Sequence, residues 1–185
     1  MAKIPLIVDL DRTLVKGDTY FRDLIYSLFF SPPHFFKSLL SYVINEKGNA
    51  KEIVAKVRFN KEFEYKFNPQ LKDFLFQNHQ VKWLVSGAHM LHAKKAMTQT
   101  KFFEQVIAST ADEHYSVPNK INWLKKNRVS SFDYAGDRFG DRHIFKLAKK
   151  AYIVNPSLLL VLWLKYSRFK FFKAFDVPWY YRWLI

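Results

Sequence analysis

Short apolar runs alternate with amphipathic stretches along this sequence, and this alternation constrains the fold more than any other feature. The apolar runs predict strands at 3–10, 81–85, 105–109, 132–135 and 151–154. Helices are predicted between them at 69–78, 89–100, 120–127 and 141–150. Strands that alternate with helices at this spacing form a parallel sheet covered on both faces. The sequence therefore predicts an α/β, doubly wound domain.

The stretch at about 18–68 interrupts the alternation, so we interpret it as a small helical insertion over the sheet. Residues 21–44 are mostly apolar and aromatic, but Pro32 and Pro33 divide them. A membrane span needs about 20 unbroken apolar residues. The break therefore predicts two helices in a hairpin, followed by a third helix at 49–59. The hairpin is interpreted as a cap that shapes access to a site, or as an element that dips into a membrane.

Polar side chains follow the predicted strands where ligands bind in open parallel sheets, at the carboxyl edge. They are Asp9 and Asp11 after the first strand, Ser86 after the second, Asp137 and Asp141 after the fourth, and Lys120 at the start of a helix. Carboxylates gathered in one place repel one another unless a cation lies among them, and oxygen ligands suit Mg²⁺. A carboxylate beside such a cation can attack phosphorus, and a second carboxylate can move the proton. This set of residues indicates phosphoryl transfer.

These residues and their order resemble the four motifs of the haloacid dehalogenase (HAD) superfamily of phosphatases that use an Asp nucleophile. The motifs are Asp9-Leu10-Asp11-Arg12-Thr13, Lys82-Trp83-Leu84-Val85-Ser86-Gly87, Lys120, and Tyr134-Ala135-Gly136-Asp137 with Asp141. The resemblance covers about residues 3–157 and implies a HAD-like sheet with a small helical cap. Locally, the hairpin, 133–137 and 153–157 also resemble the HAD domain associated with UbiA-type prenyltransferases.

The resemblance implies a role for each matching residue. Asp9 is the nucleophile, and Asp11 is the general acid and base, with its backbone carbonyl on the metal. The phosphate-binding residues are Thr13, Ser86, Gly87 and Lys120, and the Mg²⁺ ligands are Asp9, Asp11, Asp137 and Asp141. True dehalogenases lack the second Asp, so Asp11 favours a phosphatase. Arg12 stands where the family usually has Gly, and it is interpreted as contacting substrate phosphate or pointing into solvent.

Composition bounds the partners of the chain. The net charge of +14 favours anionic partners, namely a phosphorylated substrate or an acidic membrane surface, while the short basic runs disfavour nucleic acid. There is no Cys, which excludes disulfides and thiolate chemistry, and no signal peptide is recognised. The tail at 158–185 holds ten aromatic residues and five Lys or Arg. It predicts no strand, and it is interpreted either as packing on the catalytic domain at 1–157 or as a linker or membrane-proximal segment outside that domain.

The predicted function is a Mg²⁺-dependent phosphatase that hydrolyses phosphate monoesters through an aspartyl-phosphate, on the cytoplasmic side of a membrane or free of it. A short cap should leave the site open, and Tyr20 and Phe21 could form an aromatic wall. Both features favour a phosphotyrosine protein as substrate. A lipid phosphate and a non-catalytic, membrane-binding HAD domain are the alternatives. His89 and His92 are expected on a solvated helix face.

Overall fold

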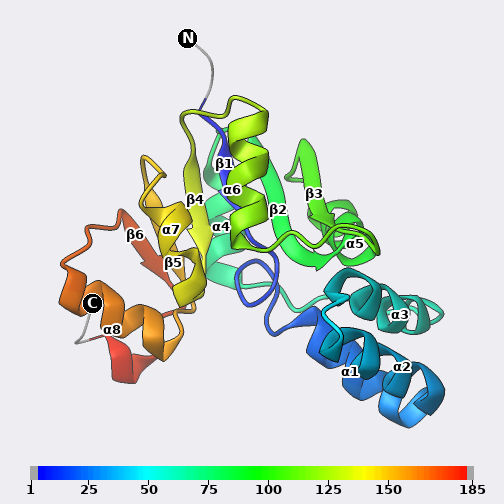
Figure 1. The fold of residues 1–185 in the computed structure, drawn as a ribbon. Helices are drawn as coiled ribbons and strands as arrows, with labels where there is room; N and C mark the ends of the chain where they lie inside the picture. The colour runs from blue at the N-terminus through cyan, green and yellow to red at the C-terminus, as the bar shows by residue number, and fades with distance from the viewer. Residues whose placement is uncertain (1–3, 183–185) are drawn as a thin grey trace.

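The computed structural model describes residues 4–182, and its centre is a six-stranded, wholly parallel sheet in the order β3-β2-β1-β4-β5-β6 (Figure 1). The strands are β1 (Leu6–Val8), β2 (Lys82–His89), β3 (Gln105–Ser109), β4 (Asp133–Gly136), β5 (Ala151–Val154) and β6 (Lys173–Phe175). This arrangement confirms the predicted α/β, doubly wound fold. The predicted first strand began at Lys3, and the predicted tail ran to 185; Lys3 and residues 183–185 lie outside the described residues.

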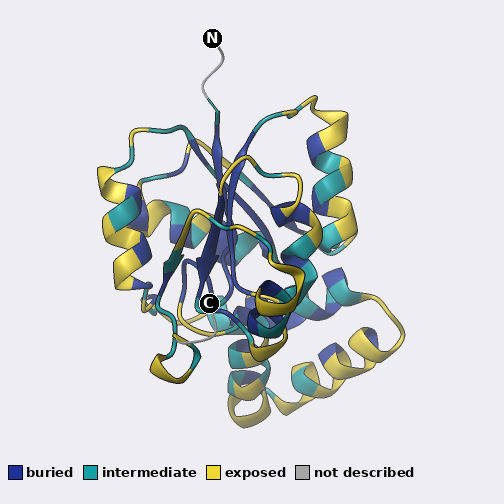
Figure 2. Ribbon diagram, turned by 90° about the vertical axis from the view of Figure 1, so that its left-hand side faces the viewer, coloured by how far each residue is buried: buried dark blue, intermediate teal, exposed yellow. Residues whose placement is uncertain are grey.

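Helices cover both faces of the sheet because side chains along each strand alternate between two apolar cores. In β1, Leu6 and Val8 pack into the core that α4 (Pro69–Gln77) and α5 (Met90–Thr100) cover, whereas Ile7 packs into the opposite core. The helices on that second face are α6 (Val117–Lys126), α7 (Arg142–Phe145) and α8 (Leu158–Ser167). The central strands β1, β4 and β5 are buried along their whole length (Figure 2), so the sheet is a rigid support for the loops at its carboxyl edge.

The insertion forms three helices, which project below the sheet in Figure 1: α1 (Thr19–Phe30), α2 (Pro32–Val43) and α3 (Lys47–Phe59). Asp18 caps α1 by accepting a hydrogen bond from the Phe21 amide at 3.1 Å. Pro32 occupies the first turn of α2, where a missing N–H costs nothing. The predicted proline break and the helical insertion are therefore both found. We call this unit the cap.

Buried polar contacts fasten the cap to the sheet domain. His92 of α5 is buried, and its Nε2 lies 2.5 Å from an Asp23 oxygen of α1 while its Nδ1 lies 2.6 Å from the Tyr65 hydroxyl. His89 is buried as well, with Nε2 3.6 Å from Glu52 of α3. The expectation that both histidines lie on a solvated face is wrong, because the cap covers the start of α5.

The tail packs on the sheet domain, which is one of the two alternatives that the sequence left open, but it also contains an unexpected strand. It contributes α8, whose Leu160, Val161 and Leu164 are buried, and β6, which extends the sheet in parallel beside β5. The prediction that this segment contains no strand is therefore wrong. β6 has three residues, of which Phe175 alone is buried, so it carries almost no periodic signal. In the part of the chain that the structure describes, no helix has the length and apolarity needed to cross a membrane.

Two other boundaries differ. A helix was predicted over 141–150, but the structure has a 3₁₀ turn (Phe139–Asp141) followed by the single turn of α7. A second 3₁₀ turn, in the tail, spans Trp179–Tyr181. β2 runs to His89 rather than ending at Val85, with an irregular register against β3 between Ser86 and His89. The extension keeps Ser86 and Gly87 in the sheet at its carboxyl edge.

Candidate active site

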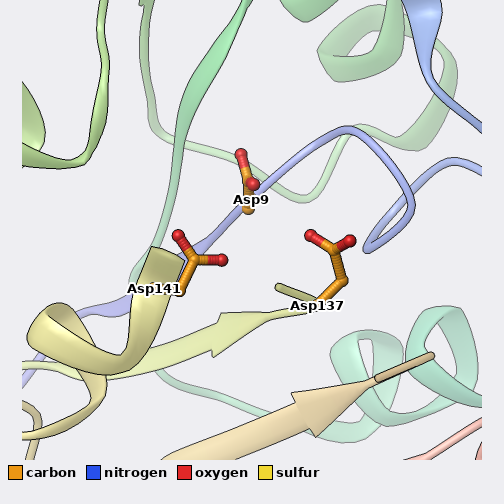
Figure 3. A group of neighbouring side chains, drawn as sticks. All are labelled: Asp9, Asp137 and Asp141. Carbon is orange, nitrogen blue, oxygen red and sulfur yellow. The ribbon is translucent and has the colours of Figure 1, made fainter. Parts of the chain in front are cut away.

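Three carboxylates meet beyond the carboxyl ends of β1 and β4 (Figure 3). Val8 and Ala135 are paired in the parallel ladder, so the next loop residues, including Asp9 and Asp137, emerge side by side. Asp141 joins them from the end of the 3₁₀ turn. One oxygen from each acid lies within 4.8 Å of the others, and all three side chains are buried.

Gly136 makes this approach possible. A Cβ at that position would lie 2.7 Å from a ring carbon of Tyr134 and 2.8 Å from Oδ2 of Asp141. Any side chain would therefore push Asp141 out of the carboxylate cluster. Gly136 belongs to the fourth motif, but the sequence analysis did not identify it as a site residue, because its importance depends on a close approach to Asp141.

The cluster is electrostatically strained without a cation. Burial, together with repulsion from Asp9 and Asp141, raises the pKa of Asp137 to about 8 despite nearby Arg138. Burial and repulsion from Asp9 likewise raise the pKa of Asp141 to about 6. Both oxygens of Asp137 and Oδ2 of Asp141 are buried without a hydrogen-bond partner in the described residues. Three hard oxygen donors in this state fit a divalent cation.

Asp9 is held in its ionised form. Its Oδ1 lies 3.0 Å from the Lys120 ammonium and accepts a hydrogen bond from the Leu10 amide at 2.9 Å. Burial opposes ionisation, but Lys120, Arg138 and a hydrogen bond from Ser86 outweigh it, so the pKa of Asp9 is lowered. The structure thus brings together Asp9, Ser86 and Lys120. Lys120 lies one turn inside α6 rather than at its start.

The pKa of Asp11, in contrast to that of Asp9, is raised. Burial and repulsion from Asp18 raise its pKa to about 6, although hydrogen bonds from Thr19 act against the rise. Oδ1 of Asp11 accepts a hydrogen bond from the Thr19 amide at 2.9 Å, which fixes the carboxyl at the start of α1. Its side chain is not part of the three-acid cluster, so a bond to metal through the side chain is not what the geometry favours.

Arg12 adopts a left-handed backbone conformation with φ of 59°, the region that its glycine counterparts occupy freely. Its Nε lies 3.3 Å from one oxygen of Asp137, and Nε of Arg138 lies 3.5 Å from the other. Arg12 therefore flanks the carboxylate cluster with a side chain that is 42% exposed to solvent, and its contact with substrate phosphate stays a prediction. Thr13 is fully buried behind this loop, and its hydroxyl has no hydrogen-bond partner among the described residues.

A cavity of about 270 Å³ lies above Asp9, between the sheet domain and the cap. The cap contributes Tyr20, which was expected in an aromatic wall, and three residues that the sequence analysis did not assign to the site: Tyr42, Lys47 and Lys51. Phe21, the other residue expected in that wall, is exposed and does not line the cavity. The rings of Tyr20 and Tyr42 stack with centroids 5.4 Å apart. Lys51 donates a hydrogen bond to the carbonyl of Gly87, which also accepts one from Ser109 at 2.9 Å. Lys47 and Lys51 lie four residues apart on α3, and this spacing is the sequence signal that could have identified them as a pair.

His114 also lines the cavity and adds no charge there. Burial and the nearby ammonium groups of Lys51 and Lys47 lower its pKa to about 4, so the imidazole is neutral at pH 7. The cations that face the cavity are therefore lysine and arginine side chains.

Comparison with known proteins shows which fold this chain has. No family model matches the sequence. The structure is similar to a protein of unknown function from Bordetella pertussis Tohama I, with a TM-score of 0.67 and 12% identity over 95% of this chain and 99% of that one. It is also similar to a haloacid dehalogenase-like hydrolase from Streptococcus pneumoniae, with a TM-score of 0.60 and 13% identity over 93% of each chain. The chain has the HAD-like fold.

Two further similarities are to a named enzyme in structure and to a longer protein in sequence. A phospho-aspartyl intermediate analogue of phosphoserine phosphatase superposes with a TM-score of 0.59 and 14% identity, covering 95% of this chain and 94% of that chain. In sequence, the uncharacterized protein y4nM of Sinorhizobium fredii is 27% identical over 159 residues, which is 84% of this chain and 31% of that protein. This chain thus spans about a third of the length of that relative. The likeness to UbiA-associated domains stays a prediction.

Proposed function

We propose that this chain is a Mg²⁺-dependent phosphatase that hydrolyses phosphate monoesters through an aspartyl-phosphate on Asp9. The observation that carries the proposal is the contrast between two neighbouring acids. Asp9 is kept ionised against Lys120, whereas the pKa of Asp11 is raised to about 6. One acid suits a nucleophile and the other a proton donor.

In the first step, an oxygen of Asp9 attacks phosphorus and the bond from phosphorus to the leaving oxygen breaks. The proton of Asp11 passes to that leaving oxygen. Lys120 and the hydroxyl of Ser86 stabilise the phosphoryl oxygens in the transition state. In the second step, Asp11 removes a proton from water as the water attacks phosphorus, and Asp9 leaves as a carboxylate beside inorganic phosphate.

The metal site in this proposal consists of Asp9, Asp137 and Asp141, with the Asp11 carbonyl as the fourth ligand that the family resemblance implies. Mg²⁺ suits carboxylate oxygens and, when bound, would compensate the charge of the phosphoryl oxygens. Arg12 and Arg138 each form an ion pair with one oxygen of Asp137, and these contacts compensate its charge and restrain its orientation. We further propose that the catalytic unit extends beyond 157 to Phe175, because α8 and β6 complete the sheet.

For the substrate, we propose a leaving group that carries a second anionic group. Lys47 and Lys51 face the cavity from the cap, and neither forms a salt bridge with a carboxylate in residues 4–182. The Tyr20–Tyr42 stack supports an aryl group beside them, as in phosphotyrosine, while a phosphorylated lipid headgroup satisfies the two lysines equally well. On either substrate, the chain would act at the cytoplasmic side, because a chain without disulfides fits a reducing compartment.

Turnover of p-nitrophenyl phosphate tests the reaction without assuming the natural substrate. We expect hydrolysis that requires Mg²⁺ and is lost in Asp9→Asn. Asp73→Asn, an exposed change on α4, is the matched control and should retain full activity. Normal turnover by the Asp9 variant would refute the mechanism.

A further inference from the structure

The first two cap helices are built with their apolar sides outward. Large apolar residues recur on one side of each helix and are exposed: Phe21, Ile25, Leu28 and Phe29 on α1, and Phe36, Leu39, Leu40 and Val43 on α2. We call these eight residues the apolar face. The residues buried on the same helices are polar or small, namely Thr19, Asp23, Ser27, Ser38 and Ser41.

The polar sides are the ones that pack inside the protein. Ser38 donates a hydrogen bond to the Ala50 carbonyl of α3 at 2.7 Å, and Asp23 reaches His92 beneath the cap. The apolar face consequently points away from α3 and from the sheet, and Figure 2 shows long exposed stretches on the helices below the sheet. A water-facing helix normally has the reverse pattern, and apolar patches of this extent mark interaction surfaces.

A second observation indicates what covers this face. A cavity of about 640 Å³ lies between the three cap helices, and its lining includes Phe30 at the end of α1 and Lys37 in the first half of α2. Lys61, also in the lining, lies 5.3 Å from the centroid of the Phe30 ring. Within residues 4–182, neither Lys37 nor Lys61 forms a salt bridge. Lys37 directly follows Phe36 on α2, and Phe30 directly follows Phe29 on α1, so both cations lie next to residues of the apolar face near the turn of the hairpin.

We propose that the cap docks on the surface of an anionic phospholipid bilayer, with the apolar face among the acyl chains and Lys37 and Lys61 at lipid phosphates. A face without polar groups matches hydrocarbon, and the net charge of +14 draws the chain to an acidic surface. The same charge disfavours a second copy on this face, because two such chains repel each other. Each helix of 12 residues is about 18 Å long, which suits an interfacial position.

This surface belongs to the hairpin, which the sequence analysis interpreted as a cap or as a membrane-dipping element, and it differs from the tail, the other segment considered for membrane contact. α8 in that tail buries Leu160 and Leu164 in the core on the second face of the sheet. Tyr20 and Tyr42, at the two ends of the hairpin, line the catalytic cavity, so docking through the cap would place that cavity next to the lipid headgroups. The docking proposal needs no catalysis and stands apart from the proposed function.

Co-sedimentation with vesicles tests the proposal, using phosphatidylcholine alone and phosphatidylcholine mixed with phosphatidylglycerol. We expect the full chain to bind the anionic vesicles. Phe29→Ser with Leu40→Ser should weaken partitioning tenfold or more, and Lys37→Gln with Lys61→Gln should weaken it on anionic vesicles specifically. Phe76→Ser, which removes an equally exposed ring from α4, is the control and should bind as the unmodified chain does.

Circular dichroism and thermal unfolding establish that each variant is folded. Equal partitioning by the Phe29 and Leu40 variant would overturn the proposal, as would failure of the unmodified chain to bind anionic vesicles. A dimer detected by light scattering that the same variant dissolves would assign the apolar face to a second copy and also overturn it.

Discussion

Asp137→Asn should make the metal-free protein more stable while removing its response to Mg²⁺. In the folded chain the pKa of Asp137 is raised to about 8, against 3.8 for the free side chain, chiefly by burial. At pH 7 this shift therefore lowers the free energy of unfolding by an amount that corresponds to roughly three pKa units, or about 4 kcal/mol at about 1.4 kcal/mol per unit. Asn avoids this penalty but weakens the contacts of Arg12 and Arg138. We expect a net gain of about 1–3 kcal/mol.

The pH dependence has a defined sign. Because the folded pKa is raised, the contribution of Asp137 is most favourable below pH 3.8 and is lost as the pH rises toward 8. The advantage of the Asn variant should accordingly be largest near pH 8 and small near pH 4. Urea unfolding in EDTA at both pH values measures this difference, and Asp73→Asn, on the exposed side of α4, serves as the control.

Adding Mg²⁺ should stabilise the unmodified chain and the control variant but leave Asp137→Asn nearly unchanged, since binding to the native state alone raises stability. A variant that is less stable than the parent in EDTA at pH 8 would refute the electrostatic reasoning. An undiminished response of that variant to Mg²⁺ would refute the assignment of Asp137 as a ligand.

Three further changes probe the rest of the site. Asp11→Asn should lower kcat for p-nitrophenyl phosphate by roughly 10²–10⁴, because proton transfer is lost while Asp9 is kept; steady-state kinetics measures this, and an unchanged kcat would exclude Asp11 as the acid. Lys47→Met should lower kcat/KM at least tenfold for phosphate esters with a second anionic group and under threefold for p-nitrophenyl phosphate; Lys56→Met, on the exposed side of α3, should change neither. Gly136→Ala should destabilise the fold by about 2 kcal/mol, because the added methyl lies within 2.8 Å of two side-chain atoms; unfolding at the parent's midpoint would contradict the tight packing.

The sheet and the acids at its edge were predictable because their signals are local. β3 and β5 have the predicted boundaries, and Asp9 and Asp137 follow strands that are neighbours in the sheet. Parallel strands bring their carboxyl ends to one edge, so residues far apart in sequence could be placed together. The proline pair at the middle of the hairpin likewise defined the break between α1 and α2.

The contacts between cap and sheet domain were not predictable, because they join segments that neither periodicity nor a motif connects. The bond between His92 and Asp23 spans 69 residues and reverses the expected exposure of that histidine. Arg12 was recognised as a departure from the family pattern, but its pairing with Asp137 depends on how the two loops meet. β6 was missed because an edge strand of three residues has too little pattern to detect.

The central claim is that Asp9 carries a phosphoryl group during turnover. The most direct test is acid quench within the first turnover of a ³²P-labelled aryl phosphate, followed by borohydride reduction and peptide mass spectrometry. We expect label on the protein that is sensitive to hydroxylamine, and reduction of the acyl phosphate to homoserine at position 9 alone. Label on another residue, or efficient turnover with no labelled protein at any quench time, would contradict the account.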